Sequence, residues 1–236
     1  MTGRPNVYLD GSHLQNVTVA EPPPQTLSHQ RSAYDRYVKP VIDRLSALVL
    51  VVLLSPVMLV VAVTVWVALG SPLTIRQPRV GRGGRVFPML KFRTMRPDRR
   101  QGQRPVPPDK DKRVTHKSAN DPRHTAVGRV LRRSSLDELP QLLNVLAGHM
   151  SLVGPRPELA HVVESVYQPW QLQRHLVKPG ITGLWQVTRR TEGNADMHLH
   201  TVDDLEYIKK QSLWLDLWIL LRTPFAVLAP KRATSQ

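Results

Sequence analysis

The sequence contains no cysteine, which excludes disulfide bonds, thiol nucleophiles and thiolate metal sites and fits a reducing compartment. Aromatic residues make up only 6% of the chain and are not interleaved with the arginines, a pattern that disfavours binding of single-stranded nucleic acid. Acidic residues are also scarce: 18 of them face 33 lysines and arginines in 236 residues, so the net charge is +15. This excess predicts an anionic partner, and nucleic acid, anionic lipid and a nucleotide-linked substrate satisfy it equally well.

The first 30 residues have no sustained apolar periodicity and include three consecutive prolines at 22–24. Because they lack an apolar stretch beside a small-residue cleavage site, they do not resemble a signal peptide, and we expect a mobile tail over residues 1–30. The rest of the chain suits a membrane segment at 31–72 and one further domain at 73–236.

Charged residues are absent from residues 45–75, which are almost entirely apolar. As a helix, residues 45–69 would run about 37 Å against a hydrocarbon core of about 30 Å, so this segment belongs in a membrane. Ser55 and Pro56 divide it near its middle, where proline removes a helical donor. Basic residues flank both ends, which leaves the positive-inside rule without a preferred direction. We expect a re-entrant helix-break-helix hairpin over 31–72, and a kinked transmembrane helix is the alternative.

Two short extended runs lie in residues 74–95 and are joined by the glycine-rich stretch 81–84, which predicts a β-hairpin. Pro78 and Pro88 confine the runs to edge strands or irregular extended chain. Lys91 and Arg93 alternate with Phe92, so two cations share one face of the second run. A solvated basic edge strand is the plain alternative for this face.

Asp137 and Glu138 are adjacent carboxylates that precede a run of leucines at helical spacing, so we expect them to open a helix. Ser135 and Glu138 have the spacing of a capping box. Pro140 fits that register imperfectly, since it cannot donate to the backbone, and a start one residue later is also open. The alternative is a capped surface helix whose acids only complement its dipole.

Arginines surround this acidic pair: Arg132 precedes it, and Arg156 follows the helix in the stretch GPRPE. Guanidinium groups bind phosphate oxygens well, and the two prolines that flank Arg156 hold it on a stiff segment. The pattern therefore indicates a carboxylate that faces an anion site, with cations that offset both charges.

Three stretches together resemble the bacterial sugar transferase family, the monotopic phosphoglycosyl transferases that start glycoconjugate assembly on a polyprenyl phosphate. They are KFRTM at 91–95, LRRSSLDELPQLLNVLAGHMSLVGPRPE ending at Glu158, and VKPGITGLWQV at 177–187. The similarity covers roughly residues 34–228 in the expected order. It implies a re-entrant helix broken at Ser55 and Pro56.

The resemblance also implies residue roles. Asp137 would attack the sugar-linked phosphate of a UDP-sugar, and Glu138 would hold Mg²⁺. Lys91, Arg93, Arg132 and Arg156 would contact substrate phosphate. Gln186, and less firmly Trp185, would contact the nucleotide, although a buried core tryptophan is the plain alternative for Trp185.

The remaining segments complete the expected fold, which is mixed α/β and mostly helical, with short strands in a small cytosolic catalytic domain at 73–236. Residues 96–125 predict a long surface loop, and residues 158–177 a helix. Residues 205–221 predict a C-terminal helix with Trp214 and Trp218 one turn apart, which suits the membrane interface; a core helix is the alternative.

We therefore expect an enzyme on the cytoplasmic face of the bacterial inner membrane. It would transfer a sugar-1-phosphate from a UDP-sugar to polyprenyl phosphate through an aspartyl-phosphosugar intermediate, release UMP and begin the synthesis of an exopolysaccharide or another glycoconjugate. The expected partners are these two substrates and the lipid bilayer, without nucleic acid, and a homodimer is left open. The alternative is a non-catalytic, membrane-anchored basic module that binds nucleic acid or anionic lipid.

Overall fold

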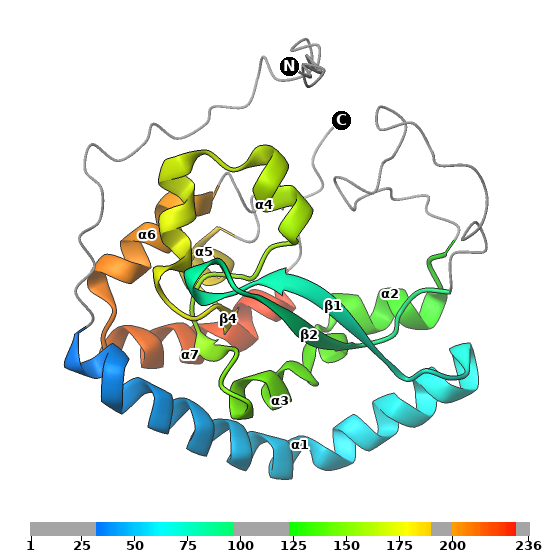
Figure 1. The fold of residues 1–236 in the computed structure, drawn as a ribbon. Helices are drawn as coiled ribbons and strands as arrows, with labels where there is room; N and C mark the ends of the chain where they lie inside the picture. Colours follow the sequence, from blue (N-terminus) through cyan, green and yellow to red (C-terminus); the bar gives the residue numbers. More distant parts are fainter. Residues whose placement is uncertain (1–31, 97–122, 190–199, 230–236) are drawn as a thin grey trace, which may run out of the picture.

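The computed structural model describes residues 32–96, 123–189 and 200–229. The tail expected at 1–30 and most of the loop expected at 96–125 lie outside these residues. A long helix, α1, lies along one side of the other elements, as Figure 1 shows. The α-helices and strands, in chain order, are α1 (Lys39–Leu69), β1 (Thr74–Val80), β2 (Val86–Phe92), α2 (Ala126–Arg133), α3 (Gln141–Leu146), β3 (Ser151–Val153), α4 (Ala160–Val166), β4 (Gly180–Thr182), α5 (Leu184–Thr188), α6 (Thr201–Lys210) and α7 (Leu213–Leu228). The predicted mixed, mostly helical fold is confirmed.

The helix α1 is the one helix in the described residues that is long and apolar enough to cross a membrane, counted with the preceding turn as Tyr34–Leu69. Only 11% of its most apolar window is buried, so it does not serve as the core helix of a water-soluble domain. Large apolar side chains cover its outer face, among them Leu53 and Val67, which are 67% and 77% exposed. Such a surface requires an apolar surrounding.

Residues Ser55 and Pro56 do not divide α1 into two helices, because the helix runs continuously through both. The predicted break is therefore not observed; instead, Figure 1 shows α1 bending near its middle. Pro56 has no N–H to donate to the carbonyl of Val52, four residues earlier. The Ser55 hydroxyl donates to that same carbonyl at 2.8 Å. The serine thus satisfies the acceptor that the proline leaves open, and the helix bends without ending.

Both ends of α1 are held by the rest of the protein. Near its start, Asp43 accepts hydrogen bonds from the Ser151 hydroxyl at 2.7 Å and from the Leu152 N–H at 3.2 Å. At its end, Arg93 donates to the backbone carbonyls of Leu69, Gly70 (2.6 Å) and Ser71 (3.1 Å). These are carbonyls that a helix C-terminus leaves without partners. The two ends therefore dock on one body while the bend lies between them.

Strands β1 and β2 form the predicted antiparallel hairpin, in which Pro78 lies opposite Pro88 and Gly83 has a positive φ of 64° in the connecting turn. The hairpin is fixed to α3 by Asn144. Its side-chain oxygen accepts from the Leu90 N–H at 2.8 Å, and its amide nitrogen donates to the Pro88 carbonyl at 2.9 Å. One side chain thereby takes the place of a neighbouring strand beside β2.

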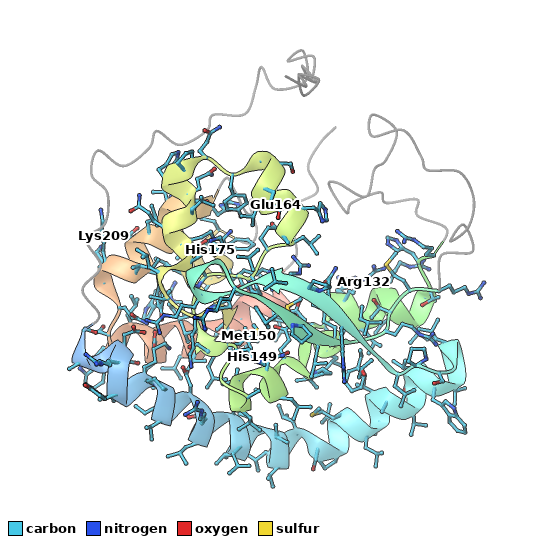
Figure 2. The ribbon with its side chains drawn as sticks, in the orientation of Figure 1. Arg132, His149, Met150, Glu164, His175 and Lys209 are labelled. Atoms are coloured by element: carbon cyan, nitrogen blue, oxygen red, sulfur yellow. The ribbon has the colours of Figure 1, made fainter. Side chains whose placement is uncertain are left out.

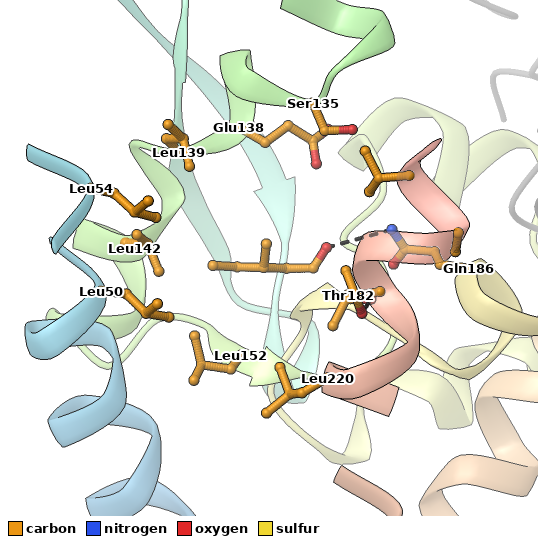
Figure 3. A pocket seen from close by; sticks show the side chains of 14 residues that line it. Leu50, Leu54, Ser135, Glu138, Leu139, Leu142, Leu152, Thr182, Gln186 and Leu220 are labelled. Atoms are coloured by element: carbon orange, nitrogen blue, oxygen red, sulfur yellow. Dashed lines mark hydrogen bonds between the residues drawn. The ribbon is translucent and has the colours of Figure 1, made fainter. Parts of the chain in front are cut away.

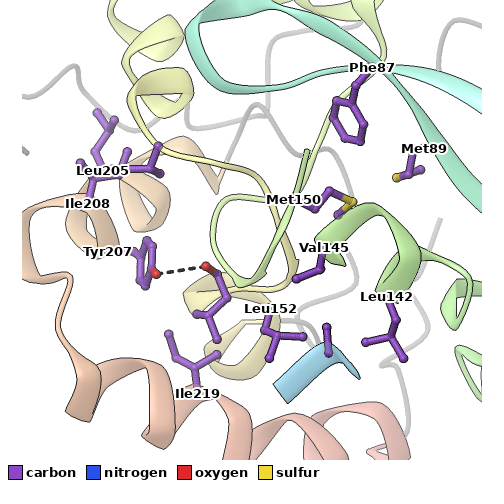
Figure 4. Packing of buried hydrophobic residues seen from close by; sticks show 13 residues of the cluster. Phe87, Met89, Leu142, Val145, Met150, Leu152, Leu205, Tyr207, Ile208 and Ile219 are labelled. Carbon is purple, nitrogen blue, oxygen red and sulfur yellow. Dashed lines mark hydrogen bonds between the residues drawn. The ribbon is translucent and has the colours of Figure 1, made fainter. Parts of the chain in front are cut away.

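The main core lies where β2, α3, the parallel pair β3 and β4, α6 and α7 meet (Figure 4). Tyr207 of α6 is 1% exposed, and its hydroxyl oxygen lies 3.1 Å from the Val153 carbonyl oxygen of β3. A second cluster joins the later part of α1 to the end of β2 and to α2 through Val61, Val65, Phe92 and Leu131. The long apolar helix α1 is therefore packed against the rest of the protein.

The segment predicted as one helix at 158–177 consists of α4 and a 3-10 helix, Pro169–Leu176. Pro169 explains the division, since proline favours an extended residue before it and Gln168 has ψ of 155°. The single C-terminal helix predicted at 205–221 is divided between α6 and α7, because the backbone leaves the helical conformation at Gln211 and Ser212. In α7, Asp216 and Ile219 are buried on one side. On the other side Trp214 and Phe225 are 80% and 75% exposed. One helix thus has both a packed face and an apolar open face.

Candidate active site

Asp137 and Glu138 lie on a short 3-10 turn, Leu136–Glu138, between α2 and α3. Ser135 has a left-handed backbone with φ of 58°, and its side chain caps no helix, so the predicted capping box is wrong. Helix α3 begins only at Gln141, after Pro140. Proline is favoured at a helix start because it lacks an N–H, and the acids are therefore left on a separate turn. Burial and the neighbouring charges, and not the dipole of α3, set their electrostatics.

Glu138 is held between Lys91 of β2 and Arg156 of the GPRPE stretch, two cations that were expected near the acids as contacts to substrate phosphate. The Lys91 ammonium lies 3.0 Å from Glu138 Oε1. Arg156 donates to both carboxylate oxygens of Glu138: Nη1 lies 3.2 Å from Oε2, and Nη2 contacts Oε1. Burial alone would raise the pKa of Glu138, but Arg156 and Lys91 outweigh it and hold the pKa well below its ordinary range. Glu138 is therefore ionised at neutral pH.

Asp137 is 6% exposed and has the opposite character. Burial, together with the negative charge of Glu138, raises its pKa from 3.8 to about 6, while Lys91 and Arg156 lower it. At pH 7 most of this carboxylate is ionised although it is poorly solvated. A weakly solvated carboxylate that is held among cations can act as a nucleophile toward an electrophilic phosphorus. The two neighbouring acids therefore suit different tasks.

Arg156 owes its position to contacts that the sequence did not reveal. Its backbone carbonyl accepts from the buried Arg174 Nη2 at 2.8 Å. Two residues further on, Glu158 pairs with Arg79 of β1 at 3.0 Å. Burial lowers the pKa of Arg79 to about 10 despite the nearby acids. The sequence did not predict the ion pair between Arg79 and Glu158. Its only signal was that each of these charged residues follows a proline in an extended segment.

Two other predicted phosphate contacts take no part in the ion pairs around Glu138. Arg93 is 6% exposed, and its guanidinium is engaged by the carbonyls at the end of α1. Arg132, on α2 (Figure 2), makes no ion pair with Asp137 or Glu138 among the residues that the structure describes. The cluster that the structure brings together is therefore Lys91, Asp137, Glu138 and Arg156.

A cavity of about 200 Å³ lies beside this cluster between α1, α3 and α7 (Figure 3). Leu50 and Leu54 of α1 line one wall, and Leu220 of α7 lines another. Glu138 and Gln186 supply polar groups at its margin. The cavity can thus accept an apolar chain that carries a polar or charged group at one end.

Gln186 lies on α5 and is 7% exposed. Its amide nitrogen faces the Ile181 carbonyl at 3.5 Å. The neighbouring Trp185 is buried and stacks on His200, with ring centroids 4.8 Å apart. Trp185 therefore occupies the buried core position that was its alternative in the sequence analysis, whereas Gln186 lines the cavity.

Comparison with family models matches residues 34–230 to the bacterial sugar transferase family. The chain belongs to the bacterial sugar transferase family. Among curated members of this family, the chain is 41% identical over 210 residues to the UDP-glucose:undecaprenyl-phosphate glucose-1-phosphate transferase of Xanthomonas campestris pv. campestris, covering 86% of this chain and 41% of the relative. It is 40% identical over 206 residues to the protein of the same name from Caulobacter vibrioides, covering 83% and 71%. It is 38% identical over 205 residues to the undecaprenyl-phosphate galactose phosphotransferase of Salmonella typhimurium, covering 82% and 41%.

These relatives of the sugar transferase family are named as transferases of sugar phosphates, so the alternative of a non-catalytic basic module gains no support from them. The matched part of the chain spans 41% of the length of the Xanthomonas relative. The resemblance to the family that the motifs predicted is confirmed.

The donor chemistry at Glu138 suits magnesium, because carboxylate oxygens are preferred Mg²⁺ ligands and the ion takes its other ligands from water and substrate phosphates. Glu138 would have to exchange one of its contacts with Lys91 and Arg156 for such an ion. Among the described residues, no group of three or more acidic or histidine side chains forms a ready-made metal site.

Proposed function

We propose that this protein transfers a sugar-1-phosphate from a UDP-sugar to polyprenyl phosphate, with Asp137 as the nucleophile. The observation that carries the proposal is the buried Asp137 carboxylate next to Glu138, whose own carboxylate is held by Lys91 and Arg156 and lines an apolar cavity beside α1. The names of the relatives support the substrate class, since they act on UDP-sugars or undecaprenyl phosphate.

In the first step an Asp137 oxygen attacks the sugar-linked phosphorus of the UDP-sugar. A bond forms between that oxygen and phosphorus, and the phosphoanhydride bond breaks, so UMP leaves with the electron pair. In this proposal Lys91 and Arg156, which contact Glu138, also offset the negative charge that develops on the diphosphate bound beside it. Gln186, at the cavity margin, contacts the nucleotide in this proposal.

In the second step an oxygen of polyprenyl phosphate attacks the same phosphorus, and Asp137 leaves as a carboxylate. The product is a polyprenyl diphosphate sugar. The cavity lined by Leu50, Leu54 and Leu220 accepts the first apolar units of the prenyl chain. This arrangement brings the lipid phosphate to the charged margin while its chain stays among apolar residues.

Magnesium belongs to the proposal as an ion held by Glu138, where it would supply positive charge to the diphosphate. Arg93 has a structural part in it, because its guanidinium is taken up by the end of α1. For Arg132 we retain the expectation of a phosphate contact, made with the bound donor and not with Glu138.

We further propose that α1 enters and leaves the membrane by one face, with the catalytic domain on the cytoplasmic side of the inner membrane. Two observations support this topology. Both ends of α1 dock on the same body, through Asp43 and Arg93. A straight helix of 31 residues would be about 46 Å long and would place its ends on opposite sides. The open apolar face of α7 extends the lipid-facing surface.

Intact-mass measurement after incubation with a UDP-sugar, without acceptor, tests the proposal. We expect one sugar-phosphate adduct per chain and one equivalent of UMP, and polyprenyl phosphate should then discharge the adduct. Because the relatives are named for glucose and galactose, a panel of UDP-sugars is used. The Asp137→Asn variant should form no adduct, whereas Glu206→Gln, which removes an exposed carboxylate on α6, should behave as the wild type. An undiminished adduct in Asp137→Asn would exclude Asp137 as the nucleophile.

A further inference from the structure

Two cationic side chains converge at a second place on α1, away from the candidate active site. Arg44 projects from α1, and Lys178 comes from the loop before β4. Both reach the position that a Cβ atom would occupy on Gly148, with Arg44 Nη2 at 2.9 Å and Lys178 Nζ at 3.8 Å from it. Gly148 has a positive φ of 80° and no side chain, so the two cations share the space above it.

Among the described residues, neither cation has an anionic partner. In the three described stretches of the chain, Arg44 and Lys178 form no ion pair, and the two acids whose charges act on Lys178 are already paired: Asp43 with Lys39 at 3.6 Å, and Asp35 with Arg82 at 3.3 Å. Burial and the nearby charge of Arg44 lower the pKa of Lys178. Two like charges that share one space are relieved by an anion between them.

The surroundings of the pair indicate what carries this anion. Arg44 borders the lipid-facing side of α1, where Val41, Leu45 and Leu48 are 54%, 60% and 52% exposed. An anion here would therefore lie directly beside apolar chains. Arginine and lysine at such a boundary keep their charges at the level of the lipid headgroups. A guanidinium is also well shaped to bind phosphate oxygens.

We propose that Arg44 and Lys178 form a binding site for the phosphate headgroup of an anionic phospholipid. The site is distinct from the acceptor site, because the active-site cavity meets α1 at Leu50 and Leu54. Leu50, the nearer of the two, is six residues beyond Arg44, or about 9 Å along the helix. A lipid bound here would fix the depth and tilt of α1, and it would do so whether or not the transfer chemistry is as proposed.

Thermal unfolding of the full chain in uncharged detergent tests this site with three probes: short-chain phosphatidylglycerol, phosphatidylcholine with the same chains, and inorganic phosphate. We expect phosphatidylglycerol to raise the wild-type melting temperature by several degrees, with clearly smaller effects of the other two. The Arg44→Gln/Lys178→Gln variant should lose this shift. The Arg129→Gln/Lys209→Gln variant, which removes two exposed cations elsewhere, should keep it.

Native mass spectrometry of the same proteins gives a second readout, counting phosphatidylglycerol molecules retained after detergent removal. The double variant at 44 and 178 should retain one fewer than the wild type. Equal shifts and equal retention in both double variants, or no shift in the wild type, would overturn the proposal. An equal shift with inorganic phosphate would overturn the lipid as its source. Melting without any probe verifies that each variant folds.

Discussion

The ammonium of Lys39, at the start of α1, lies 2.5 Å from Oδ2 of Asp216 in α7, although 177 residues separate them in the chain. Both side chains are buried, and Tyr34 and Tyr207 donate to the same carboxylate, each at 2.7 Å. Asp216 therefore ties the membrane helix to the C-terminal helix. This accounts for an acid in the first turn of a mainly apolar helix.

Replacing Asp216 by asparagine should strongly destabilise the protein. The change leaves the buried Lys39 with only a distant contact to Asp43 at 3.6 Å, and removal of one partner of a buried pair costs about 3–5 kcal/mol. We expect a clear fall in the free energy of unfolding in detergent micelles. The Glu206→Gln variant, which breaks an exposed pair with Lys210, should change it by less than about 1 kcal/mol. Equal effects of the two changes would contradict this account of Asp216.

Replacing Asp137 by asparagine should stabilise the protein at neutral pH while it abolishes adduct formation. The folded pKa of Asp137, about 6, exceeds its ordinary value of 3.8, so the folded state binds the proton more tightly. Wild-type stability should therefore fall as pH rises from about 4 to 6 and should then level off. The variant lacks this loss and should gain up to about 3 kcal/mol at pH 7, but nothing near pH 4.

Chemical denaturation of both proteins at pH 4 and pH 7 measures this difference. Glu138→Gln is not an equivalent control, because Glu138 is stabilised in its charged form. A stability difference between wild type and Asp137→Asn that does not change with pH would contradict the raised pKa of Asp137.

The rate of adduct formation should depend on pH through the same carboxylate. Only ionised Asp137 can attack phosphorus, so the single-turnover rate should fall about tenfold for each pH unit below about 6 and should level off above pH 7. Rapid-quench measurement of UMP release without acceptor checks this dependence. A rate that stays constant down to pH 5 would show that another group attacks.

Glu138→Gln should lower both stability and activity, because it leaves Lys91 and Arg156 together without their shared anion. We expect a loss of about 3 kcal/mol and at least a tenfold lower rate of UMP release. The double variant Lys91→Met/Glu138→Gln should recover part of the stability and none of the activity. Recovery of both would mean that Glu138 acts only by balancing the charge of Lys91.

Ser55 and Pro56 should be coupled in stability through the Val52 carbonyl. In Ser55→Ala this acceptor loses its hydroxyl donor in an apolar surrounding, which should cost about 1–2 kcal/mol. In the Pro56→Ala background an N–H becomes available to the carbonyl, so the same serine change should cost much less. Thermal unfolding of the four proteins of this cycle measures the coupling. Additive effects would contradict the shared acceptor.

Much of the site could be predicted from the sequence because its residues lie in motifs with local signals. The hairpin followed from glycines between two extended runs, and Lys91 and Arg156 were correctly placed beside the acids. The helix start failed because Pro140 outweighed the capping pattern of Ser135 and Glu138. Local sequence rules evaluate the capping pattern and the proline separately, whereas only one of the two helix starts can form in the structure.

Other contacts could not be predicted, since they join positions far apart in the chain. The sequence predicts Arg93 as a phosphate ligand on an extended run, but in the structure its guanidinium donates to three carbonyls at the end of α1. Asn144 and Asp216 are polar residues in mainly apolar helices, and nothing near them in the sequence indicates their partners. Their partners, Leu90 and Lys39, become visible only in three dimensions. The sequence predicted a break at Pro56 and not a continuous helix. The hydrogen bond from the Ser55 hydroxyl to the Val52 carbonyl, which keeps the helix continuous, depends on the rotamer of Ser55 and cannot be read from the sequence.

The anchoring of Asn144 beside β2 has a consequence for self-association. An open strand edge invites pairing with the edge of another copy. In this protein the middle of that edge is occupied by an amide side chain, and Pro78 and Pro88 remove donors from both strands. On the far side of the hairpin, Val80 donates to the Glu158 carbonyl at 2.8 Å. The hairpin is therefore protected from edge-to-edge pairing with another copy and from the sheet growth that leads to fibrils.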